Sequence, residues 1–147
     1  MTILELKRAQ LEAVKKTLSM WSWLYEHPDE RKGKFIEKKM SKKSQRVLND
    51  CYLCECSKEI TSLLGIKSVN CCLCPVEWTQ NLSKYHTPCC RDDSPYFRYI
   101  FDFLNYQNLV KGDVKEVLNI LLKTKKQLLK EIKNESENRT DRAADSH

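Results

Sequence analysis

The chain has 147 residues, a formal net charge of +6 and charged side chains at 31% of its positions. This length suits one domain with a modest core. No stretch approaches the roughly 20 consecutive apolar residues of a membrane-spanning helix, and the first residues lack the apolar core of a secretory signal. We therefore expect a cytoplasmic protein, in which thiols stay reduced and clustered cysteines favour metal binding over disulfides.

The composition also predicts the fold class. Three glycines and four prolines are few for this length, and abundant Lys, Glu and Leu favour helices. We expect a mainly helical single domain, residues 1–133, in which two long terminal helical segments pack around a central cysteine-rich zinc-knuckle unit. Its predicted parts are a helix (1–27), a basic segment (28–49), a zinc unit (50–93) and two helices (94–133), followed by a disordered tail (134–147).

Residues 3–26 are predicted to form the first helix. Apolar side chains recur there at spacings of three, four and seven, which place them on one face; they are Leu4, Leu11, Val14, Leu18, Trp21 and Tyr25. Pro28 disfavours helical angles at His27 and ends the helix. We expect this face to pack in the core, with a helix-in-groove or dimer face as the alternative.

The segment 28–49 is the main electrostatic feature, with eight basic and three acidic residues, a net charge of +5. Six basic side chains could contact phosphates, namely Lys34, Lys38, Lys39, Lys42, Lys43 and Arg46. They lack an interleaved ladder of aromatic side chains on which bases could stack. We therefore expect a solvated surface, and we keep weak nucleic-acid binding through residues 31–46 as the alternative function of the chain.

All eight cysteines lie between positions 51 and 90. Cys51 and Cys54 form one pair and Cys71 and Cys74 another, separated by sixteen residues, which is typical of a four-cysteine zinc site. Thiolates at positions i and i+3 of a tight turn can face one point, so two such turns can hold a tetrahedral zinc ion. We predict that these four cysteines bind one structural zinc, with an iron–sulfur cluster as the chemical runner-up.

Other residues of this block are additional or alternative ligands. They are Cys56, Cys72, His86, Cys89 and Cys90. They could hold a second zinc ion, and the alternative is that the remaining cysteines are buried thiols. Between the two pairs, Ser57–Leu64 is predicted to be a short helix with Ser57 as its N-cap and Gly65 at its end. Trp78 is expected to cover the zinc site.

An enzyme is not expected. Four protein ligands leave no position on zinc for a reacting water. The chain lacks both the His-x-Glu with Pro-Cys-x-x-Cys signature of zinc deaminases and a glycine-rich phosphate loop. The pair of His86 and Cys89 is chemically conceivable as base and nucleophile, but it is explained more simply as metal ligands or a surface histidine.

The C-terminal part is predicted to hold two helices. Ser94 and Pro95 are a typical N-cap and first helical residue, and residues 96–106 are rich in aromatic side chains. Gly112 is expected to break the helix, and Asp113 to cap the next one. The second helix has an apolar stripe made of Val114, Val117, Leu118, Leu121, Leu128 and Ile132. Residues 134–147 lack apolar side chains to anchor them, and we expect them to be disordered.

Several motifs together resemble a diffuse group of small, largely uncharacterised bacteriophage proteins. The motifs are Trp21-Ser-Trp23-Leu24, His27-Pro28, Cys51 with Cys54, Cys71 with Cys74-Pro75 and Trp78, Cys89 or Cys90, and Ser94-Pro95-Tyr96-Phe-Arg-Tyr99. The resemblance covers roughly residues 18–125. It implies a phage-encoded zinc protein and no particular activity. The basic segment and the doubled cysteines depart from the pattern.

From these features we expect a small phage-type zinc-binding accessory protein. It would bind and modulate a host protein, such as a defence or transcription component, in the cytoplasm of the infected bacterium. The contact surface would be the exposed part of the aromatic stretch 96–106 or the N-terminal helix. The zinc would be structural, and no membrane would be involved.

Overall fold

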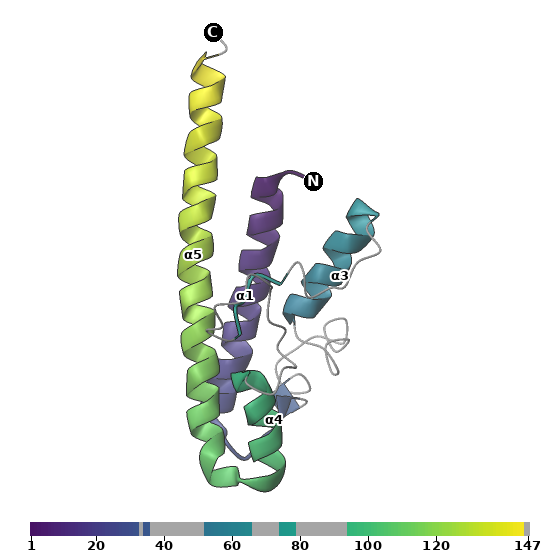
Figure 1. The fold of residues 1–147 in the computed structure, drawn as a ribbon, viewed down its shortest axis with the longest axis vertical. Coiled ribbons are helices and arrows are strands. Elements are labelled where there is room, and N and C mark those ends of the chain that lie inside the picture. Colours follow the sequence, from purple (N-terminus) through teal and green to yellow (C-terminus); the bar gives the residue numbers. More distant parts are fainter. Residues whose placement is uncertain (33, 36–51, 66–73, 79–93, 146–147) are drawn as a thin grey trace.

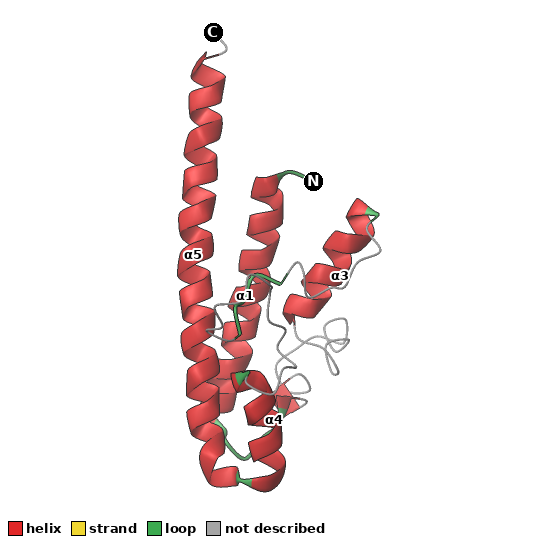
Figure 2. Cartoon of the chain, viewed as in Figure 1, coloured by secondary structure: helices red, strands yellow, loops and turns green. Residues whose placement is uncertain are grey.

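The computed structural model describes residues 1–32, 34–35, 52–65, 74–78 and 94–145. Its elements are α1 (Ile3–Glu26), α3 (Tyr52–Leu64), α4 (Pro95–Asn105), the 3-10 helix η3 (Gln107–Leu109) and α5 (Val110–Asp145). Within these residues there is no strand (Figure 2). The predicted mainly helical fold is therefore confirmed.

The two terminal helices, α1 and α5, lie side by side and run in opposite directions (Figure 1). In the same view α3 lies against the other side of α1, and α4 covers the end of the pair away from the termini. With its 36 residues α5 is about 54 Å long, whereas the 24 residues of α1 span about 36 Å, so α5 extends beyond its partner. None of the described helices is both long and apolar enough to cross a membrane.

Helix α1 has the bounds that the sequence predicts. At its start Thr2 and Glu5 form a reciprocal cap: Thr2 Oγ1 accepts from the Glu5 N–H at 3.1 Å, and the Glu5 carboxylate accepts from the Thr2 N–H at 2.8 Å. At its end the His27 N–H donates to the Trp23 and Leu24 carbonyls, directly before Pro28. Local signals at both ends therefore set this helix.

The core lies mainly between α1 and α5. Buried side chains from α1 include Leu11, Val14, Met20, Trp21 and Leu24, and those from α5 include Val110, Val114, Val117, Leu121 and Leu128. Thr17 and Thr124 are also buried, and each donates its hydroxyl to a carbonyl of its own helix, at 2.7 and 2.9 Å. The predicted packing of two long terminal helices is confirmed, because both apolar stripes face this interface.

Helix α4 attaches to this pair through aromatic side chains. Ser94 Oγ accepts from the Tyr96 N–H at 3.2 Å, with Pro95 at the first helical position, as predicted. The Trp21 ring of α1 meets Tyr99 edge to face, with ring centroids 4.8 Å apart, and meets Tyr96 at 5.8 Å. Such edge-to-face pairs each contribute about 0.5–1.5 kcal/mol beyond the area they bury.

The start of α5 differs from the prediction. The helix begins at Val110, so Gly112 lies inside its first turn and does not break it, and Asp113 is not an N-cap. Val110 and Val114 are buried. Burying both outweighs the cost of about 1 kcal/mol that a glycine adds to a helix interior.

The C-terminal residues also differ from the prediction. Helix α5 continues to Asp145, whereas we expected disorder from residue 134. As predicted, these residues have no apolar side chains to anchor them, and the side chains from 137 to 142 are all exposed. Extending an existing helix requires no new nucleation, so charged helix-forming residues can continue it without tertiary contacts.

Candidate functional site

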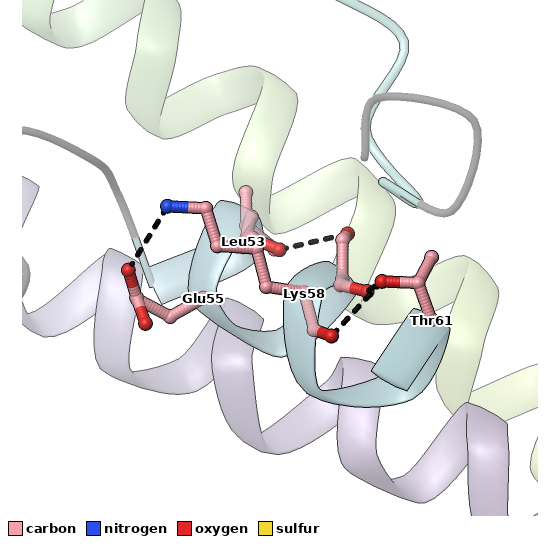
Figure 3. A network of polar contacts seen from close by, with 5 residues as sticks. Leu53, Glu55, Lys58 and Thr61 are labelled. Atoms are coloured by element: carbon pink, nitrogen blue, oxygen red, sulfur yellow. Dashed lines mark hydrogen bonds and ion pairs between the residues drawn. The ribbon is translucent and has the colours of Figure 1, made fainter. Parts of the chain in front are cut away.

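Helix α3 carries two of the candidate ligands, Cys54 and Cys56. It begins at Tyr52, so residues 52–56 are helical and do not form the tight turn that we predicted. Ser57 is not an N-cap: it is buried inside the helix and donates to the Leu53 carbonyl at 2.9 Å (Figure 3). The Ser57 hydroxyl therefore bonds to a carbonyl of the preceding turn instead of capping the first turn of a helix.

The polar contacts of α3 continue along the same helix. Thr61 Oγ1 is 3.0 Å from the Ser57 carbonyl oxygen and 2.9 Å from that of Lys58, and Lys58 Nζ lies 3.5 Å from a Glu55 carboxylate oxygen (Figure 3). The helix ends at Leu64, and Gly65 follows with a φ of 66°. This left-handed angle favours glycine, so the predicted end of the helix is confirmed.

Three cysteines lie at the rim of the core. Cys54 and Cys56 on α3 and Cys74 on the segment 74–78 are each half-buried and pack against the main hydrophobic cluster. Leu53, Val76 and Trp78 belong to that cluster, so α3 and the segment 74–78 share it. One member of each predicted zinc pair, Cys54 and Cys74, is therefore anchored next to the same core.

The other candidate ligands fall outside the described residues. They are Cys51, Cys71, Cys72, His86, Cys89 and Cys90. Within the described part of the chain, no three or more His, Cys, Asp or Glu side chains are placed to hold a metal ion. The donor chemistry of Cys54 and Cys74 fits zinc, because cysteine sulfur is a common ligand of structural zinc. The four-cysteine site stays a prediction.

The environment of the Cys56 thiol disfavours its ionised form. Burial raises the pKa of the Cys56 thiol, and Glu59 raises it further, while Lys16 lowers it. A raised pKa keeps the sulfur protonated at neutral pH, whereas a metal ligand must be a thiolate. The role of Cys56 as an additional or alternative ligand stays a prediction.

Trp78, which we predicted to cover the zinc site, is 2% exposed. Its ring lies 5.9 Å from that of Tyr96 on α4, measured between centroids. Trp78 therefore ties the segment that begins at Cys74 to α4. Cys74 precedes Trp78 by four residues, and the expectation that Trp78 covers a zinc site stays a prediction.

The basic segment is described only at its beginning. Lys34 is exposed, while Lys38, Lys39, Lys42, Lys43 and Arg46 lie outside the described residues. The guanidinium of Arg31 lies 5.0 Å from the centre of the Phe103 ring, and the Lys32 ammonium lies 5.9 Å from that of Tyr96. These first two cations therefore contact aromatic rings of α4. Nucleic-acid binding by the segment stays a prediction.

Helix α4 and η3 expose a group of large apolar side chains, which we call the apolar face. It consists of Ile100, Phe101, Leu104, Tyr106 and Leu109, which are 43%, 50%, 65%, 53% and 49% exposed. The Phe101 and Tyr106 rings are 5.9 Å apart. The opposite side of α4 carries Tyr99 and Asp102, which are buried. The predicted aromatic stretch is thus divided between a core side and an exposed side.

The comparisons with known proteins do not add to this picture. No protein-family model, curated protein or solved structure matches the chain. The resemblance to small bacteriophage proteins therefore stays a prediction.

Proposed function

We propose that the chain is a small zinc-stabilised helical protein that binds a partner protein through the apolar face. One observation carries this proposal: five large apolar side chains, each at least 43% exposed, lie within the ten residues from Ile100 to Leu109. Isolated apolar side chains are common on surfaces, but a contiguous group is typical of an interaction site. Covering it would stabilise a complex by about 25 cal/mol for each Å² of apolar area removed from water.

In this proposal zinc has a structural role. Cys51, Cys54, Cys71 and Cys74 would hold one zinc ion, and their thiolates would supply a tetrahedral cross-link between two parts of the chain that are far apart in sequence. Cys54 lies on α3, which packs against α1. Cys74 lies on the segment 74–78, whose Trp78 contacts Tyr96 of α4. The metal would therefore support the helix that bears the apolar face. An iron–sulfur cluster and a second zinc ion remain the chemical alternatives.

The partner that we propose is a cytoplasmic protein of the bacterial host, a defence or transcription component, as the resemblance to phage proteins implies. A binding role needs no catalytic group, and we propose no enzymatic activity. The alternative, nucleic-acid binding by residues 31–46, would use electrostatic attraction to phosphates. The two functions can be separated because one depends on the apolar face and the other on lysines.

Changing Leu104 to Asp should abolish capture of the partner by the immobilised protein. A carboxylate at a position that becomes buried in a complex must lose its hydration, which is unfavourable. We expect the affinity to fall by a factor of 100 or more, which corresponds to a loss of about 3 kcal/mol of binding free energy. Capture from a nuclease-treated bacterial lysate, measured by quantitative mass spectrometry, checks this result.

Leu122→Asp is the matched control. Leu122 is 53% exposed on α5 and lies outside the apolar face, so the same change there should leave capture intact. Equal capture by the two variants would contradict the proposed surface. Loss of all capture after nuclease treatment of the wild-type sample would instead favour the nucleic-acid alternative.

A further inference from the structure

The apolar face carries no charge of its own. From Tyr99 to Val110 the only charged residue is Asp102, which is 8% exposed and therefore buried. Every exposed side chain in this run is neutral. Covering the face therefore requires no charged group to lose its hydration, which is the most unfavourable part of burying a protein surface.

The charged residues that border the face are engaged within the same chain. Arg98 forms an ion pair with Glu116 of α5. The ammonium of Lys111 lies 4.7 Å from the centre of the Tyr25 ring of α1. Two copies of the chain each carry a net charge of +6, so they repel each other at long range. Their apolar faces can nevertheless meet without like charges lying opposite each other.

Carbonyl groups near the end of α4 are also satisfied within the chain. Such groups often lack a hydrogen-bond partner inside the helix itself. Here Asn105 Nδ2 donates to the Phe101 carbonyl at 2.9 Å, and Gln107 Nε2 donates to the Phe103 carbonyl. This end of α4 can therefore lose its contact with water without leaving these two carbonyls unpaired.

The size of the face decides how firmly a second copy could cover it. Five large side chains that are about half-exposed present on the order of 400–500 Å² of surface. Two such faces together would bury on the order of 800–1,000 Å², which is less than the roughly 1,200 Å² of the smallest stable interfaces. An interface of this size is typical of weak, transient association.

We propose that two copies of the chain associate through their apolar faces into a weak symmetric dimer, which covers the face until a partner protein displaces the second copy. A twofold interface brings the same surface of each copy together, so that surface has to be compatible with itself. A neutral apolar face meets this condition, whereas a surface of one charge sign does not. The displacement rests on the proposed function, but the dimer depends only on the apolar face.

Sedimentation equilibrium of the purified full-length protein under reducing conditions, which prevent disulfides between copies, tests the dimer. Interfaces of standard size reach micromolar to picomolar affinity, so for this smaller one we expect a dissociation constant on the order of 100 µM. Between roughly 5 µM and 1 mM protein, which brackets that value, the average mass should rise from the 17.4 kDa of one chain toward twice that mass. Raising the salt concentration should not weaken the dimer, because no ion pair holds it together and salt screens the repulsion between the copies.

The Leu104→Asp and Leu122→Asp variants locate the interface. Leu104→Asp should stay monomeric at every concentration, because each copy would bring a carboxylate into the interface. Leu122 lies outside the apolar face and is 53% exposed, so Leu122→Asp should dimerise like the wild-type protein. In the wild-type protein itself, the NMR methyl signals of Ile100, Leu104 and Leu109 should shift with concentration, while those of Leu122 should not. This second measurement needs no variant.

Wild-type protein that remains monomeric at the highest concentration would overturn the dimer, and so would Leu104→Asp protein that dimerises like the wild type. Monomeric wild-type protein whose partner capture still depends on Leu104 would overturn the dimer and leave the proposed function standing. Dimerisation that depends on Leu104, combined with equal partner capture by Leu104→Asp and Leu122→Asp, would support the dimer and contradict the proposed function.

Discussion

Replacing Cys54 with serine should remove the bound zinc and destabilise the packing of α3 on α1. A serine hydroxyl is a poor zinc ligand, and three remaining thiolates cannot close a tetrahedral structural site. In small zinc peptides the metal contributes about 10–16 kcal/mol of apparent binding free energy, comparable to the whole stability of a typical domain, about 5–15 kcal/mol. Zinc content by mass spectrometry and thermal melting by circular dichroism check both parts of this result.

Cys56→Ser is the matched control for this experiment. Cys56 lies two residues further along α3 and is also half-buried, yet burial raises the pKa of its thiol. This variant should keep its zinc and melt close to the wild-type temperature. A Cys54→Ser protein with full zinc content and normal melting would show that Cys54 is not a ligand. Loss of zinc from both variants would make Cys56 a primary ligand.

Replacing Leu121 with alanine should lower the free energy of unfolding by about 2–5 kcal/mol, the usual cost of removing a buried leucine side chain and leaving a cavity. Leu121 is 0% exposed and belongs to the core between α1 and α5. At this chain length each kcal/mol lowers the melting temperature by roughly 2–4 °C. Urea denaturation followed by circular dichroism gives the change in free energy directly.

The adjacent residue provides the control for this variant. Leu122 is 53% exposed, so Leu122→Ala should change the unfolding free energy by no more than about 0.5 kcal/mol. The two variants share the substitution, the helix and almost the same position, and differ in burial. Similar destabilisation by both would contradict the orientation of α5 described above.

The parts of the fold that were predicted correctly carry strong local signals. Helix α1 combines a regular apolar stripe with Pro28 directly after its end, and α4 begins with the cap formed by Ser94 and Pro95. Gly65 ends α3 with a left-handed backbone angle that favours glycine. In each case the residues that set the boundary are neighbours in the sequence, so tertiary contacts are not needed to find it.

The boundaries that were predicted incorrectly depend on tertiary contacts. Ser57 and Asp113 are both residue types that favour N-caps, yet both are buried inside helices. Ser57 donates to the Leu53 carbonyl of its own helix, and Asp113 is buried in the first turn of α5, which packs against α4. The local sequence around a serine or aspartate can be the same whether the residue is an N-cap or is buried inside a helix. Only the packing of α3 and α5 distinguishes these two roles here.

In the candidate site, too, some features follow from local sequence and others depend on tertiary contacts. The spacing of the cysteines predicts the zinc pairs, but the apolar face could not be separated from the core in residues 96–106. Hydropathy is misleading there, because Asp102 is buried while Leu104 is 65% exposed. Asp102 follows Tyr99 by three residues, so both lie on the same side of α4, but only the position of α5 makes that side the buried one.

The metal content of the wild-type protein, purified without chelators, tests the central claim most directly. Native mass spectrometry should find one zinc ion per chain if Cys51, Cys54, Cys71 and Cys74 are the ligands, and two if the remaining cysteines and His86 form a second site. Removal of the metal by a chelator should lower the melting temperature markedly, because the binding free energy of a structural zinc contributes to folding. A metal-free protein whose melting temperature is the same with and without added zinc would contradict the account.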